Sequence, residues 1–124
     1  MEPFKIIDED IAYVELYDDF IISSIKDDIV FDIEELNWFL MIFDKYYPDK
    51  KFGYIGNRIF NYNLNPTTYL TSSFHDRLSA MAIVYYSEIG RETALYEKSF
   101  FKKPFSVFDN IEEAKSWIYE ILKK

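Results

Sequence analysis

The segment Leu78–Tyr86 constrains the fold more than any other part of the sequence. It reads Leu-Ser-Ala-Met-Ala-Ile-Val-Tyr-Tyr and is almost continuously apolar. A run of this kind, with hydrophobic residues on both of its faces, is typical of a strand that is covered on both sides. We therefore expect this strand in the middle of a sheet, with helices packed above and below it.

The rest of the chain alternates between patterns typical of strands and of helices. β-Branched and aromatic residues predict strands, and apolar residues at three- and four-residue steps behind a capping residue predict helices. The predicted strands are 4–7, 11–16, 20–25, 51–56, 78–86 and 105–108. The predicted helices run from the capping box of Asp32 and Glu35 to Pro48, from Pro66 to about His75, from Ile89 to Phe101, and from a cap at Asp109 or Asn110 through Leu122.

This order of elements predicts one α/β domain over residues 1–124. Closely spaced strands at the start favour antiparallel pairing, and the later alternation of helices and strands favours parallel pairs. We expect a mixed β-sheet with an N-terminal antiparallel hairpin and about four flanking helices. No stretch has the Gly-, Ser- or Pro-rich composition of a linker between domains.

Composition excludes several classes of protein. Hydrophobic residues make up 49% of the chain and aromatic residues 20%, which excludes a disordered segment. The formal net charge of -8 argues against the basic surface that nucleic-acid binding needs. The chain has no cysteine and one histidine, so disulfides, thiolate nucleophiles and Cys- or His-rich metal sites are excluded as well.

Targeting and membrane signals are not found in the sequence. The start Met1–Lys5 carries an acidic residue where a secretory signal would be basic, and no apolar segment of a signal peptide follows. The longest apolar runs are much shorter than the roughly 20 residues that span a bilayer. We therefore expect a cytoplasmic protein that does not insert into a membrane.

Three acidic clusters, Asp8–Asp10, Asp18–Asp19 and Asp27–Asp28, fall between predicted strands. Aspartate favours turns because its short side chain accepts hydrogen bonds from nearby backbone N–H groups. A cation site is the alternative, but the clusters have neither the spacing nor the glycine of a calcium-binding loop. We expect these clusters to form turns and no metal site.

No segment carries the signature of a catalytic or cofactor site. The glycines at 53, 56 and 90 match neither of the common phosphate-binding loops. His75 stands beside Asp76 and near Ser72, but neighbouring side chains on a helix do not converge, and no nucleophile elbow is present. We expect no cofactor and no enzymatic activity.

Arg58, Asn61, Tyr62 and Tyr69 are the strongest candidates for a binding site. Arg58 follows a predicted strand end, where open α/β sheets place their ligand crevices. Arginine can hold a carboxylate or phosphate through two parallel hydrogen bonds, and tyrosine adds an apolar face with a polar tip. The structural alternative is that Arg58 ties its loop to carboxylates or carbonyls of its own fold, while the tyrosines pack.

Two parts of the chain carry a resemblance to a known family. One is the closing segment Pro104–Asp109 with the helix through Ala114 and Trp117; the other is the middle stretch Tyr54–Arg58, Asn61–Tyr62 and Asn65–Tyr69. Together with the order of elements, they resemble the SpoIIAA-like branch of the STAS superfamily. The resemblance implies a mixed sheet flanked by helices and no established enzymatic activity. It also implies a role in protein–protein regulation or, by likeness to the CRAL-TRIO lipid-transfer fold, in binding small apolar ligands.

Thr67 and Thr68 stand where regulatory STAS domains carry a phosphoacceptor segment of the Asp-Ser/Thr-Ser-Gly type. Here the sequence reads Asn65-Pro66-Thr67-Thr68, so the family's serine switch is not transferred. The two hydroxyls at a predicted helix N-terminus are a candidate phosphoacceptor or anion site. Alternatively, they satisfy backbone groups in the first turn of that helix.

These observations predict a non-enzymatic binding or regulatory module that acts through protein–protein interaction. An exposed aromatic patch would dock a protein partner or a second copy, because aromatic residues and arginine are enriched at interface centres. The alternative is a carrier or sensor of a small apolar or anionic ligand bound near Arg58, Tyr62 and Tyr69. Tyr54 and Phe74 would then complete the wall of the pocket.

Overall fold

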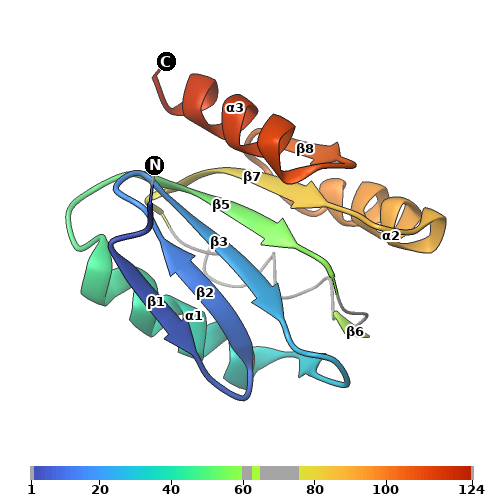
Figure 1. Ribbon diagram of the computed structural model, residues 1–124, viewed down its shortest axis with the longest axis horizontal. Helices are drawn as coiled ribbons and strands as arrows, with labels where there is room; N and C mark the ends of the chain where they lie inside the picture. Colours follow the sequence, from blue (N-terminus) through green and yellow to red (C-terminus); the bar gives the residue numbers. More distant parts are fainter. Residues whose placement is uncertain (1, 60–62, 65–75, 124) are drawn as a thin grey trace.

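The computed structural model describes residues 2–59, 63–64 and 76–123 (Figure 1). The strands are β1 (Lys5–Asp8), β2 (Ala12–Leu16), β3 (Phe20–Ile25), β4 (Val30–Phe31), β5 (Phe52–Asn57), β6 (Asn63–Leu64), β7 (Leu78–Val84) and β8 (Phe105–Phe108). Three helices lie in these residues, namely α1 (Ile33–Tyr46), α2 (Glu88–Lys98) and α3 (Ile111–Leu122). The short helix predicted over 66–75 lies outside the described residues.

Six of the strands form one mixed sheet in the order β1-β2-β3-β5-β7-β8 (Figure 1). β1, β2 and β3 pair antiparallel, and β3, β5, β7 and β8 pair parallel. The α/β class, the mixed sheet and its antiparallel N-terminal strands are therefore confirmed. β4 and β6, which follow β3 and β5 along the chain, form a separate two-stranded parallel sheet.

β7 is not the middle strand that its apolar sequence predicted. It lies between β5 and the edge strand β8, and β3 and β5 hold the middle of the sheet. Its side chains are nevertheless covered on both faces, since Met81 and Ile83 belong to one core cluster and Ala80 and Ala82 to the other. An apolar run therefore indicates that both faces are buried, but it does not give the place of the strand in the sheet.

Helices α1 and α2 pack on one face of the sheet and α3 packs on the other (Figure 1). Leu36 and Phe43 of α1 share the first core cluster with Ala94 of α2. Ala114 and Ile118 of α3 belong to the second cluster. The connections β3–α1–β5 and β7–α2–β8 both move the chain in the same direction across the sheet. Because crossover connections between parallel strands are right-handed, both helices lie on the same face.

Helices α1 and α3 begin at capping residues that the sequence predicted. The Asp32 side chain accepts a hydrogen bond from the backbone N–H of Glu35, and Glu35 Oε1 accepts one from the N–H of Asp32 at 2.9 Å, which confirms the capping box of α1. Of the two candidate caps for α3, Asn110 is the one used. Its Oδ1 accepts from the N–H of Glu113 at 2.9 Å.

The end of α2 differs from the prediction. The helix ends at Lys98 rather than at Phe101. Lys103, which follows the predicted end of this helix, donates to the carbonyls of Asp76 at 3.1 Å and Leu78 at 2.6 Å. The ammonium group therefore joins the segment before β8 to the start of β7.

The three acidic clusters lie at the turns that follow β1, β2 and β3, as predicted. Asp28, in the third turn, has a φ of 64°, a left-handed conformation that aspartate tolerates better than most residues. In the described residues, no group of three or more acidic or histidine side chains is arranged to hold a metal ion. The same part of the chain contains no helix that is both long and apolar enough to cross a membrane.

Tyr17 makes the stability of the fold depend on pH in the alkaline range. Its buried ring stacks on Phe20 with 4.7 Å between ring centroids, and its hydroxyl donates to Glu15 Oε1 at 3.2 Å. Burial, followed by the charge of Glu15, raises the pKa of Tyr17 from 10.0 to about 12. The unfolded chain loses this proton first, so the free energy of unfolding falls as the pH rises from 10.0 to about 12.

We expect the wild type to lose about 2 kcal/mol more stability over this pH range than the Tyr17→Phe variant, which keeps the ring and removes the titration. Urea unfolding at a series of pH values measures both proteins. Equal losses in the two proteins would show that the phenol of Tyr17 ionises as readily in the folded chain as in the unfolded one.

Candidate functional site

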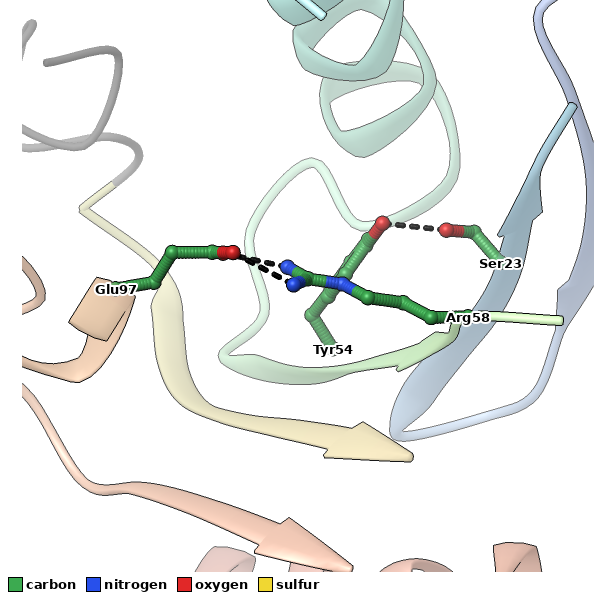
Figure 2. A network of polar contacts seen from close by, with 4 residues as sticks. All are labelled: Ser23, Tyr54, Arg58 and Glu97. Atoms are coloured by element: carbon green, nitrogen blue, oxygen red, sulfur yellow. Dashed lines mark hydrogen bonds and ion pairs between the residues drawn. The ribbon is translucent and has the colours of Figure 1, made fainter. Parts of the chain in front are cut away.

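Arg58 follows the end of β5, at the carboxyl edge of the parallel strands, as predicted. Its backbone N–H donates to the carbonyl of Val84 at 3.0 Å and so extends the pairing of β5 with β7. Its side chain reaches α2 (Figure 2), where Nη1 donates to Glu97 Oε2 at 2.6 Å and Nη2 donates to Glu97 Oε1 at 2.5 Å. This two-point geometry is the strongest form of an arginine–carboxylate contact.

The Arg58–Glu97 pair is buried, with side-chain exposures of 9% and 2%. Removing two charges from water costs several kcal/mol per ion, and the pair offsets that cost only where its geometry is good. Here two guanidinium nitrogens and both carboxylate oxygens engage each other. The pair therefore fastens the end of β5 to α2, across a separation of 39 residues in sequence.

Glu97 is a site residue that sequence reasoning missed, although a signal for it was present. Ala94, Glu97 and Phe101 are buried and stand three and four residues apart. Glu97 thus stands in the row of side chains that faces the core, where an apolar residue is usual. A carboxylate buried there needs a cation as its partner. The contact with Arg58 matches the structural alternative considered for that residue. Ligand binding by Arg58 stays a prediction.

Ser23 of β3 and Tyr54 of β5 form a second polar contact in the same region (Figure 2). Their hydroxyl groups hydrogen-bond to each other, and their exposures are only 1% and 7%. The Tyr54 ring meets Phe39 and Phe43 edge-on, with centroid distances of 5.9 Å and 6.4 Å. Tyr54, expected in the wall of a ligand pocket, is therefore packed in the core beneath α1.

The other predicted binding residues, Asn61, Tyr62 and Tyr69, lie outside the described residues, as do the candidate anion-site residues Thr67 and Thr68. Their grouping around Arg58 therefore stays a prediction. The same holds for the other two residues considered in that stretch, Phe74 and His75.

The described strands do not form the crevice that motivated the choice of Arg58. In open α/β sheets, a ligand crevice forms where the strand order reverses direction. Here β3, β5, β7 and β8 follow one another in a single direction. In addition, β4 pairs with β6 through Val30 with Asn63 and Phe31 with Leu64, which joins the segments that leave β3 and β5.

Helix α2 exposes apolar side chains on its outer side. Ile89 is 76% exposed and Tyr96 is 61% exposed, whereas the buried residues of the helix are Ala94 and Glu97. Ile89, Glu92 and Tyr96 recur at steps of three and four and share one side of the helix. We call these three residues the α2 stripe. Its tyrosine ring is oriented by an edge-on contact with Phe100 at 5.3 Å.

Comparisons of the chain with family models, with curated proteins and with solved structures give no match. The chain is an α/β protein with a mixed six-stranded sheet, a buried arginine–glutamate pair at the carboxyl edge and an exposed apolar stripe on α2.

Proposed function

We propose that this chain is a non-enzymatic interaction module of STAS-like architecture, whose α2 stripe binds a basic, apolar segment of another protein. The observation that carries the proposal is the exposure of Ile89 and Tyr96 on a helix whose buried side contains a glutamate. An amphipathic helix ordinarily turns its apolar side to the core. Apolar side chains turned to solvent in a row therefore favour a contact surface.

The STAS-like part of the proposal is supported by the order of the elements. Antiparallel strands come first, and helices then alternate with parallel strands of the same sheet. The segments Tyr54–Arg58 and Pro104–Asp109, which carry the resemblance in sequence, occupy β5 with its end and β8 with the residues around it. Regulation through protein contacts is what this resemblance implies.

The charge of the stripe favours a basic partner. Glu92 is exposed and lies between Ile89 and Tyr96, and no ion pair joins it to another of the described residues. The whole chain carries a formal charge of -8, which attracts a cationic segment at long range. A second copy of the chain is disfavoured, because a two-fold contact through the stripe would bring like charges together.

A synthetic amphipathic peptide of leucine and lysine, with leucines at three- and four-residue steps, is the probe for this surface. We expect fluorescence anisotropy to show saturable binding, and a peptide with glutamate in place of lysine to bind at least tenfold more weakly. Ile89→Ala, which removes apolar surface without changing the charge, and Glu92→Lys should each raise the Kd of the lysine peptide about tenfold. Equal binding of the two peptides would contradict the proposed partner chemistry.

Control variants separate this surface from the general attraction of an acidic protein for lysine. Glu34→Lys makes the same charge change at an exposed position of α1. Met41→Ala removes an apolar side chain of the same helix that is 66% exposed. Both should change the Kd less than about twofold. If Glu34→Lys weakens binding as much as Glu92→Lys, the stripe is not the site. If Ile89→Ala changes the sedimentation of the protein alone, the stripe contacts a second copy instead.

A further inference from the structure

A cavity of about 480 Å³ opens at the edge of the sheet opposite to Arg58. It lies where β5, β7 and β8 begin and where α3 ends, and Figure 1 shows the end of α3 above the starts of β5 and β7. Its volume is within the range of pockets that hold small molecules. The lining residues used below are Asp19, Lys51, Pro104, Ile121, Leu122 and Lys123.

The wall of this cavity is apolar on one side. Pro104 precedes β8, and Ile121 and Leu122 belong to the last turn of α3. Pro104 is exposed and the other two side chains are partly exposed, so hydrocarbon meets solvent inside the cavity. A ligand with an apolar body would remove this surface from water, at a gain of about 25 cal/mol per Å².

Two ammonium groups border the cavity. Lys51 is exposed, and none of the other described residues forms an ion pair with it. Lys123 stands 4.4 Å from the centroid of the Tyr119 ring and is held only loosely by Glu120, at 3.9 Å. Nearby, burial lowers the pKa of Lys103; the charge of Asp76 opposes this shift, and the charge of Lys51 adds to it.

One carboxylate also borders the cavity, and its charge is already engaged. Asp19 Oδ1 lies 3.0 Å from the ammonium of Lys50. The ammonium groups of Lys51 and Lys123, the latter only loosely paired with Glu120, therefore outweigh the one carboxylate in the lining, which is paired with Lys50. We propose that this cavity binds an amphipathic monoanion, with its carboxylate or sulfonate held by Lys51 and Lys123 and its apolar body against Pro104, Ile121 and Leu122. This site is independent of the α2 stripe.

The fluorescent probe 8-anilinonaphthalene-1-sulfonate, an aromatic monoanion, tests the site in the full chain. We expect saturable binding of one probe per chain, with displacement by decanoate. Decan-1-ol, which lacks the charge, and acetate, which lacks the tail, should each need at least tenfold higher concentrations to displace the probe. Displacement by decan-1-ol as readily as by decanoate would overturn the role of the lysines.

Opposite charge changes in the lining should move the affinity in opposite directions. Lys51→Gln should raise the Kd of the probe about fivefold, and Asp19→Asn should lower it about threefold. Lys102→Gln removes an exposed charge from the same edge without touching the lining, and should change the Kd less than about twofold. An equal effect of Lys102→Gln and Lys51→Gln would overturn the proposal.

The position of the bound probe can be read without any variant. In a nitrogen-15 correlation spectrum, the largest shifts on addition of the probe should be those of the amides of Ser79, Tyr119 and Leu122, which line the cavity. Largest shifts at the carboxyl edge, around Arg58, would place the site elsewhere and overturn the proposal.

Discussion

Replacement of Arg58 by alanine is expected to lower the free energy of unfolding by about 3–5 kcal/mol. The variant removes the two hydrogen bonds that the Glu97 carboxylate accepts from the guanidinium group, and in the wild type the Glu97 side chain is only 2% exposed. A buried charge that loses its counter-charge costs far more than the pair itself contributes. Urea unfolding measures the change as a lower midpoint.

Two further variants make this result specific. Arg91→Ala breaks an exposed pair with Glu88, in which the side chains are 44% and 72% exposed, and should cost less than about 0.5 kcal/mol. The double variant Arg58→Met with Glu97→Leu removes both charges and should recover most of the loss. If Arg58→Ala costs no more than Arg91→Ala, the pair does not hold α2, and ligand binding becomes the better account of Arg58.

Gly53→Ala is expected to lower the free energy of unfolding by about 2–3 kcal/mol. A Cβ at this position would stand 2.5 Å from Ile118 Cγ1, 3.0 Å from its Cδ1 and 3.4 Å from Leu122 Cδ1. The nearest of these atoms lies close to the backbone of a buried helical residue, so it cannot swing away. Helix α3 would have to lift from β5, and chemical unfolding would report the loss.

A double-variant cycle tests whether this contact is the cause. Ile118→Ala alone should cost about 2–4 kcal/mol by opening a cavity, and Gly53→Ala in that background should cost much less than in the wild type. Gly56→Ala on the same strand is the matched control. There the nearest atom, Ile83 Cδ1 at 3.0 Å, is the movable end of a side chain, so the cost should stay under about 1 kcal/mol. Simple additivity in the cycle would contradict the close approach at Gly53.

Local patterns predicted most elements of this fold. The strands β3 and β8 have the predicted bounds, and the capping box starts α1, because these features depend on neighbouring residues alone. The position of β7 in the sheet could not be predicted, since it depends on which strands pair. Trp117 of α3 is partly buried and packs against Phe108, with 5.8 Å between the ring centroids.

Of the two residues in the buried ion pair, the sequence predicted the place of Arg58 but not that of Glu97. Arg58 was singled out because it follows a predicted strand end, and its position at the end of β5 was predicted correctly. Its contact with Glu97 joins residues 39 apart, and no local pattern specifies such a pair. The cavity bordered by Lys51 and Lys123 could not be predicted either, because five separate segments of the chain line it and none of them carries a binding motif of its own.

The pairing pattern of the sheet has a consequence for the order of folding. β1, β2 and β3 pair across short turns, as Asp8 does with Tyr13, so little chain entropy is lost when these loops close. Each parallel pair requires a much longer loop, since Phe20 meets Gly53 only after the whole of α1 has intervened. The antiparallel part of the sheet can therefore form before any crossover, and the parallel strands add to an edge that already exists.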